Sequence, residues 1–138
     1  MSHAKALRVI GQTLDTAGIT TFKLHKCAEF YRLWTVEYVF CFAADDICRL
    51  DSKAQKRRKN NSTPIRSTLL SHQLRALGDY LDRREVTTFR IVWTADSALL
   101  DYEQLDGDRT SKAFTPEELR QLGLHRSLFR SSQYLLHP

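Results

Sequence analysis

Two stretches of this chain repeat each other. Residues 7–25 begin LRVIGQTLDTAGITTFK and residues 74–92 begin LRALGDYLDRREVTTFR. The two windows share eight identical residues at an offset of 67, where about one would be expected from average composition. A second match, FAADDICRL (42–50) with FTPEELRQL (114–122), lies at an offset of 72, so the second copy carries five additional residues. The sequence predicts an internal duplication, with repeat 1 at 1–60 and repeat 2 at 61–138.

Each copy has the pattern of a helix followed by strands. Aliphatic residues recur with helical spacing in both copies, at Leu7, Ile10 and Leu14 and at Leu74, Leu77 and Leu81. Residues 19–25 (ITTFKLH) and 86–93 (VTTFRIVW) are rich in β-branched and aromatic residues, which favour strands. Residues 30–42 and 98–114 supply one or two further strands in each copy.

Helix ends are marked by residues that cap them. Gly18 suits the end of the first helix. The sequence Thr115-Pro116-Glu117-Glu118 predicts a helix start, with Thr as the cap, Pro at the first position and acids at the positive end of the dipole. We expect Thr63-Pro64 to open the helix of repeat 2 in the same way. The predicted fold is α+β: a duplicated α-β-β(-β)-α unit forming one pseudo-twofold domain, with helices packed on an antiparallel sheet.

Three residues on or beside the helical stripe recur in both copies: Arg8, Gly11 and Asp15 in the first, and Arg75, Gly78 and Asp82 in the second. Glycine inside a helix costs about 1 kcal/mol relative to alanine, so we interpret Gly11 and Gly78 as points where another element approaches closely. We expect the charged residues to form ion pairs across the repeats, Arg8 with Asp82 and Arg75 with Asp15. A ligand pocket repeated twice is the alternative.

Length and composition place the chain among single globular domains. The 138 residues are 42% hydrophobic and 27% charged. No apolar run is long enough to cross a membrane, and the first twelve residues lack the features of a signal peptide, so we expect a cytoplasmic location. The odd number of cysteines and the absence of a CxxC pair argue against a disulfide framework and a zinc site. We expect Cys41, in the apolar run VFCFA, to be buried.

Sequence patterns of catalytic sites are missing. The chain has no P-loop, GxGxxG, HExxH or GxSxG motif, and its five histidines are scattered. The acid pairs Asp45-Asp46 and Glu117-Glu118 are explained by the helix starts that they occupy. We therefore expect a non-catalytic protein without a cofactor or metal.

One segment, KAQKRRKNNSTPIR (53–66), carries the whole positive charge excess of the chain. It contains six cations and no acid, whereas the remaining residues hold fifteen basic and sixteen acidic side chains. The cations are Lys53, Lys56, Arg57, Arg58, Lys59 and Arg66. Such a cluster fits the phosphates of a nucleic acid, an acidic protein, a membrane surface or a solvated linker. No aromatic residue lies between the charges, so base stacking has no platform in this segment.

These patterns favour a small binding module whose first partner to test is nucleic-acid phosphate, contacted through residues 53–66. Two alternatives remain open at this point. The first is a protein-interaction or scaffold protein that acts through sheet edges or the apolar C-terminal residues 127–138. The second is an enzyme with a site at the repeat interface. Both a monomer and a homodimer are compatible with the sequence.

Overall fold

The structure, a computed structural model, describes residues 1–27, 29–58 and 69–121, and for 54–58 it describes the backbone alone. Each half of the chain contains a helix, three strands and a second helix, which in the second half is described only over residues 116–121. The elements are α1 (His3–Ala17), β1 (Phe22–Cys27), β2 (Phe30–Trp34), β3 (Val39–Phe42), α2 (Ala44–Arg58), α3 (Leu70–Arg83), β4 (Phe89–Trp93), β5 (Ala98–Glu103) and β6 (Arg109–Phe114). Residues 116–121 are also helical.

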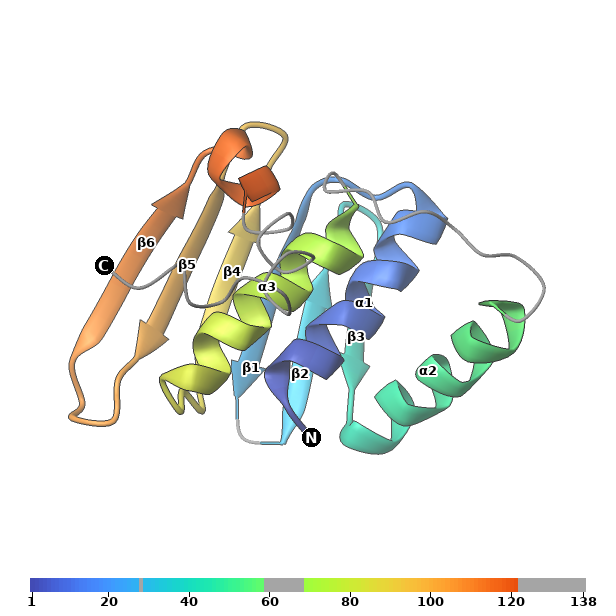
Figure 1. Cartoon of the computed structure of the whole chain (residues 1–138), viewed down its shortest axis with the longest axis horizontal. Helices are drawn as coiled ribbons and strands as arrows, with labels where there is room; N and C mark the ends of the chain where they lie inside the picture. The colour runs from blue at the N-terminus through green and yellow to red at the C-terminus, as the bar shows by residue number, and fades with distance from the viewer. Residues whose placement is uncertain (28, 59–68, 122–138) are drawn as a thin grey trace, which may run out of the picture.

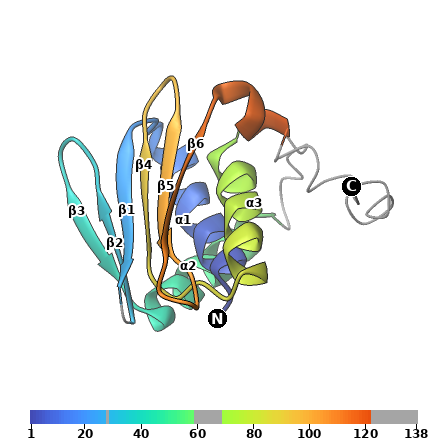
Figure 2. The ribbon, with the colours of Figure 1, turned by 90° about the vertical axis from the view of Figure 1, so that its left-hand side faces the viewer.

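The six strands form one antiparallel sheet in the order β3-β2-β1-β4-β5-β6. The first strands of the two halves pair at its centre, with Leu24 of β1 opposite Ile91 of β4. Helices α1 and α3 lie side by side across one face, and α2 lies beyond α1 near the β3 edge (Figures 1 and 2). The predicted α+β fold is confirmed. The two halves share one element order, and their origin in a duplication stays a prediction.

The core lies between the α1–α3 pair and the sheet. The aliphatic stripes of both helices are buried there, together with alternate residues of β1, β2, β4 and β5. The fully buried large side chains are Leu7, Ile10, Leu14, Leu24, Leu33, Ile47, Leu74, Leu77, Leu81, Phe89, Ile91 and Leu100. The apolar faces that the helical and strand periodicities create therefore pack against each other in one layer.

Helices α1 and α3 approach closely at two glycines. A Cβ atom on Gly11 would lie 2.6 Å from the Cα of Ser71 and 2.7 Å from its backbone nitrogen. A Cβ atom on Gly78 would lie 2.5 Å from the Cα of Ala4. Both neighbours are backbone atoms that cannot rotate away, so the helices pack at this separation only because both positions lack a side chain.

Two carboxylates connect the same helices reciprocally. Asp15, near the end of α1, accepts hydrogen bonds from the backbone amides of Leu70 and Ser71 at 2.9 and 3.0 Å. Asp82, near the end of α3, accepts them from the amides of His3 and Ala4 at 2.8 and 3.0 Å. Each acid thus caps the first turn of the other helix, where free N–H groups and the positive end of the dipole favour an anion.

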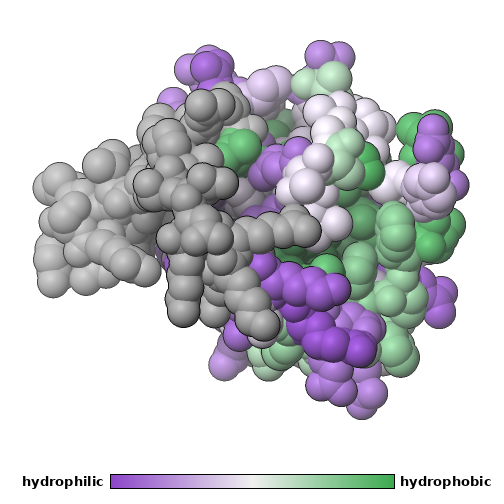
Figure 3. Space-filling view, turned by 90° about the vertical axis from the view of Figure 1, so that its right-hand side faces the viewer, coloured by the Kyte–Doolittle hydropathy of each residue, from purple (hydrophilic) through white to green (hydrophobic). Residues whose placement is uncertain are grey.

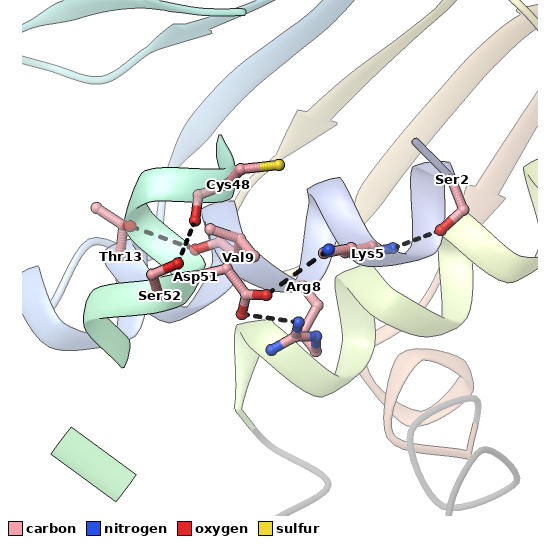
Figure 4. Close-up of polar contacts among 8 residues, drawn as sticks. All are labelled: Ser2, Lys5, Arg8, Val9, Thr13, Cys48, Asp51 and Ser52. Atoms are coloured by element: carbon pink, nitrogen blue, oxygen red, sulfur yellow. Dashed lines mark hydrogen bonds and ion pairs between the residues drawn. The ribbon is translucent and has the colours of Figure 1, made fainter. Parts of the chain in front are cut away.

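Of the two ion pairs expected between the repeats, the one from Arg8 was predicted with the wrong partner. Arg8, which we expected to contact Asp82, instead pairs with Asp51 of α2 at 3.0 Å, and Lys5 lies 3.9 Å from the same carboxylate. Figure 4 shows this cluster, in which Asp51 points from α2 toward α1. Asp51 is buried, so this polar contact holds α2 against the neighbouring helix. Arg75 lies partly exposed on α3.

Two of the predicted helix ends are confirmed, and the predicted start of α3 is not. Gly18 ends α1 in the left-handed conformation, with φ of 71°. Thr115 and Glu118 form the capping box: the Glu118 amide donates to Thr115 Oγ1 and the Thr115 amide donates to Glu118 Oε1, both at 3.2 Å. The start predicted at Thr63-Pro64 lies outside the described residues, and it does not begin α3. That helix begins at Leu70 after the extended residue Leu69, with Asp15 supplying the cap that the local sequence lacks.

Candidate functional site

The face of the sheet turned away from the helices, here called the open face, is covered by no described helix (Figure 2). Successive side chains of a strand point to opposite faces, and the burial of the strands follows this rule. In β1, Phe22 and Leu24 are buried under the helices, whereas Lys23 is exposed on the other side. The same alternation in β2 and β4 places exposed arginines on the open face.

Four cations, here called the open-face cations, share this surface: Lys23, Arg32, Arg90 and Arg109. The imidazole of His25 lies among them. His25 of β1 lies directly between two of them, opposite Arg32 on β2 and opposite Arg90 on β4. Lys23 precedes it on β1 and Arg109 begins β6. Arginines and a histidine in adjacent strands therefore form one row across the middle of the face.

The pKa of His25 reports the positive potential at this row. Partial burial lowers it below its ordinary value of 6.5, and the charges of Arg90, Arg32 and Arg109 lower it further. Protonation of His25 would place like charges directly opposite each other, which destabilises a sheet. Asp101 of β5 lies 3.8 Å from Arg90 in a solvent-exposed pair, which offsets little of this repulsion. The open-face positions of β1 and β2 hold no carboxylate.

Aromatic residues alternate with the cation on β2. Phe30, Arg32 and Trp34 occupy every second position of that strand, so their side chains share the open face. Phe30 is 44% exposed, and Trp34, partly exposed, lies opposite Lys23 on β1 and Val39 on β3. A flat, accessible aromatic side chain next to a cation can contact both parts of a nucleotide, the base and the phosphate.

Our sequence reasoning missed this surface because it examined the charges as a run along the chain. The open-face cations come from four different strands, and only the register brings them together. One local signal was available: FYRLW (30–34) alternates aromatic, charged and aromatic residues with the period of a strand. The pattern predicts a face that carries Phe30, Arg32 and Trp34, but it does not predict which strands lie beside it.

The basic segment 53–66 is placed only in part. Lys53 is exposed on α2, on the side of the sheet that the helices cover (Figure 1). Lys56, Arg57 and Arg58 belong to the last part of α2, and nothing further is described for their side chains. Lys59 and Arg66 lie outside the described residues, as does the C-terminal stretch 127–138. The role of this segment stays a prediction.

The edge strand β3 is apolar and accessible, and Figure 3 shows hydrophobic residues gathered on this side beside hydrophilic ones. Val36, Tyr38, Val39 and Phe40 are 89%, 58%, 65% and 40% exposed. Cys41 is exposed as well, so the expectation that it would be buried was wrong. The run VFCFA is apolar without being central, because β3 is the outermost strand and Cys41, opposite Arg32, lies on the open face.

The other titratable cluster joins the start of α1 to the sheet. His3 Nε2 donates to the backbone oxygen of Val86 at 2.6 Å, which leaves Nδ1 to accept from the Tyr31 hydroxyl at 2.9 Å. Burial, together with the nearby carboxylate of Asp82, raises the pKa of Tyr31. Since both ring nitrogens are engaged within the fold, these contacts anchor the N-terminus of α1.

Across the described residues, no three His, Cys, Asp or Glu side chains gather closely enough to hold a metal ion. Within the same ranges, no helix has the length and apolarity to span a membrane. Comparisons with protein-family models, curated proteins and solved structures found no match for this chain.

Proposed function

We propose that this protein is a non-catalytic nucleic-acid-binding module that holds phosphates on the open face of its sheet. The observation that carries this proposal is the row in which Arg32, His25 and Arg90 lie side by side on adjacent strands. A phosphate bound at this row would offset the positive potential that the two arginines create around His25. Arginine and lysine also release counterions from the nucleic acid when they bind it.

The chemistry of the site favours binding over catalysis. The open-face cations are donors that position a phosphodiester backbone, and arginine can hold one phosphate with two hydrogen bonds. The open face carries two acids on β5: Asp101, which already pairs with Arg90, and Glu103, which lies opposite Arg109 in the register. Contacts of this kind read little sequence, so we expect affinity to depend on salt more than on base order.

Residues 53–66 are a second source of phosphate contacts in this proposal. Lys53 lies on α2 and lines a hollow at the β3 edge together with Cys41 and Phe42, so a strand that follows the open face has to turn around that edge to reach it. The segment and the open face can therefore be tested separately. A contribution from both would mean that nucleic acid passes around the β3 edge.

The test is fluorescence anisotropy of labelled single-stranded and duplex DNA and RNA across a salt series. We expect Arg32→Ala/Arg90→Ala to weaken binding and to reduce the slope of log K against log salt by about two. Arg49→Ala/Arg120→Ala is the charge-matched control, because both of these side chains are exposed cations on helices. The variant Lys56→Ala/Arg57→Ala/Arg58→Ala/Lys59→Ala measures the basic segment.

Wild-type affinity in the open-face variant would refute the proposal. If the control pair weakened binding as much as the open-face pair, the effect would be one of net charge alone, and the open face would lose its special role.

A further inference from the structure

The face that carries the cations also carries flat apolar side chains, and these point to the kind of nucleic acid that fits. We propose that the open face selects single strands, with bases stacking on Phe30 and Trp34 while Arg32 holds phosphate between them. This inference rests on the proposed function and goes beyond it, because phosphate contacts alone do not distinguish a single strand from a duplex.

The spacing along β2 supports this arrangement. A strand rises about 3.3 Å per residue, so Phe30 and Trp34 lie about 13 Å apart along it and Arg32 lies midway. Both aromatic side chains can contact solvent, in contrast to the other tryptophan, Trp93, which is 5% exposed and stacked on Phe22 with ring centroids 5.6 Å apart. The two tryptophans thus occupy opposite faces of the sheet, one for packing and one for contact.

The row around Trp34 extends the apolar surface. In the register, Trp34 lies between Val39 on β3 and Lys23 on β1. Beyond Lys23 the same row continues across the sheet with Val92 on β4 and Leu99 on β5. Val39 and Leu99 are 65% and 44% exposed. An apolar row beside the cationic row is what an extended strand needs, because its bases leave water while its phosphates remain paired with cations.

A duplex does not fit the same surface. Its bases are stacked inside the helix and expose only their edges in the grooves, and the major groove, about 12 Å wide, admits a helix or a two-stranded ribbon. Strand β2 is flanked by β3 and β1 within a six-stranded sheet, so it cannot enter a groove. Phe30 and Trp34 therefore reach base faces only where the strand is unpaired.

The experiment is a titration of the intact chain with a labelled oligothymidylate, a duplex of equal length and inorganic polyphosphate, followed by tryptophan fluorescence and by competition. We expect the oligothymidylate to quench Trp34 and to bind more tightly than the duplex. Polyphosphate should compete without the same quenching. Trp34→Ala should weaken oligothymidylate binding between about 5- and 150-fold with little change in the salt slope. Trp34→Phe, which keeps a stacking surface, should restore most of the affinity.

The outcomes separate the two proposals. If neither oligothymidylate nor polyphosphate binds, the proposed function fails. If both bind but Trp34→Ala and Phe30→Ala hold the oligothymidylate as tightly as the wild type, or if the duplex binds equally well, stacking is refuted while phosphate binding stands. Urea unfolding of each variant shows whether a loss of affinity reflects a loss of folded protein.

Discussion

Replacing Gly11 with alanine sets two physical effects against each other. Helix propensity alone favours alanine by about 1 kcal/mol. The structure predicts the opposite sign, because the new Cβ would lie 2.6 Å from the Cα of Ser71 and 2.9 Å from the carbonyl carbon of Leu70. Carbon atoms pack at about 3.5–4.0 Å, so α1 and α3 would have to separate by about 1 Å.

That separation acts on the whole helix interface. It would loosen the buried aliphatic layer and lengthen the hydrogen bonds from the Leu70 and Ser71 amides to Asp15, now 2.9 and 3.0 Å long. Overpacking of a core costs about 1–3 kcal/mol, and here the neighbour is backbone, which cannot change rotamer. We expect Gly11→Ala to be destabilised by a net ~2 kcal/mol, the upper part of that range less the gain in propensity.

The assay is urea unfolding followed by far-ultraviolet circular dichroism. With an m value of about 1–3 kcal/mol per molar urea, the midpoint should fall by about 1 M. Thr16→Ala is the control, since Thr16 is exposed on the same helix and its replacement should change stability by less than about 0.5 kcal/mol. A Gly11→Ala variant more stable than the wild type would refute the close approach of the two helices.

Three further predictions follow from named contacts. Asp15→Ala, which removes a carboxylate that accepts two amides of α3, should lose about 1–2 kcal/mol in urea unfolding, and a loss below about 0.5 kcal/mol would contradict its role as a cap. Because the pKa of His25 is lowered in the folded protein, the unfolded chain binds that proton more tightly, so stability should fall as pH drops below about 6.5. His25→Gln should reduce this fall when urea midpoints are compared at neutral and mildly acidic pH, and an unchanged pH profile would contradict the prediction. Val39→Lys puts a charge on the exposed edge strand and should raise the concentration at which light scattering detects aggregates; an unchanged onset would mean that β3 does not drive association.

The fold was largely predictable because its information is local. The spacing of the aliphatic residues that begin at Leu7 and at Leu74 predicts two helices. The β-branched segments after these helices predict strands. What the sequence could not provide was the partner of each polar group. Asp15 was expected to meet an arginine, whereas it caps a helix that begins 55 residues later in the chain. Such contacts depend on tertiary packing, which periodicity does not encode.

The candidate site was less predictable for the same reason. A charge run such as 53–66 is visible in one dimension, whereas Arg32, His25 and Arg90 become neighbours only through the order of the strands. The prediction that Cys41 is buried failed for a similar reason. Its apolar neighbours in the sequence are typical of a core strand, but an edge strand leaves such residues exposed. Edge or centre is a property of the sheet and not of the strand.

The two halves differ most where the site is proposed. At the offset of 67, the two helices keep the same leucines, glycine and capping aspartate, as in Leu7 and Leu74, whereas Arg32 and Trp34 correspond to Leu99 and Asp101. All four side chains lie on the open face. Packing constrains both halves equally, because Asp15 and Asp82 each cap the helix of the other half, and Gly11 and Gly78 each make room for that helix. The open face has no such requirement, so the aromatic and cationic residues of β2 are free to serve a partner. That asymmetry favours one binding site running from β2 toward β4 over two equivalent sites.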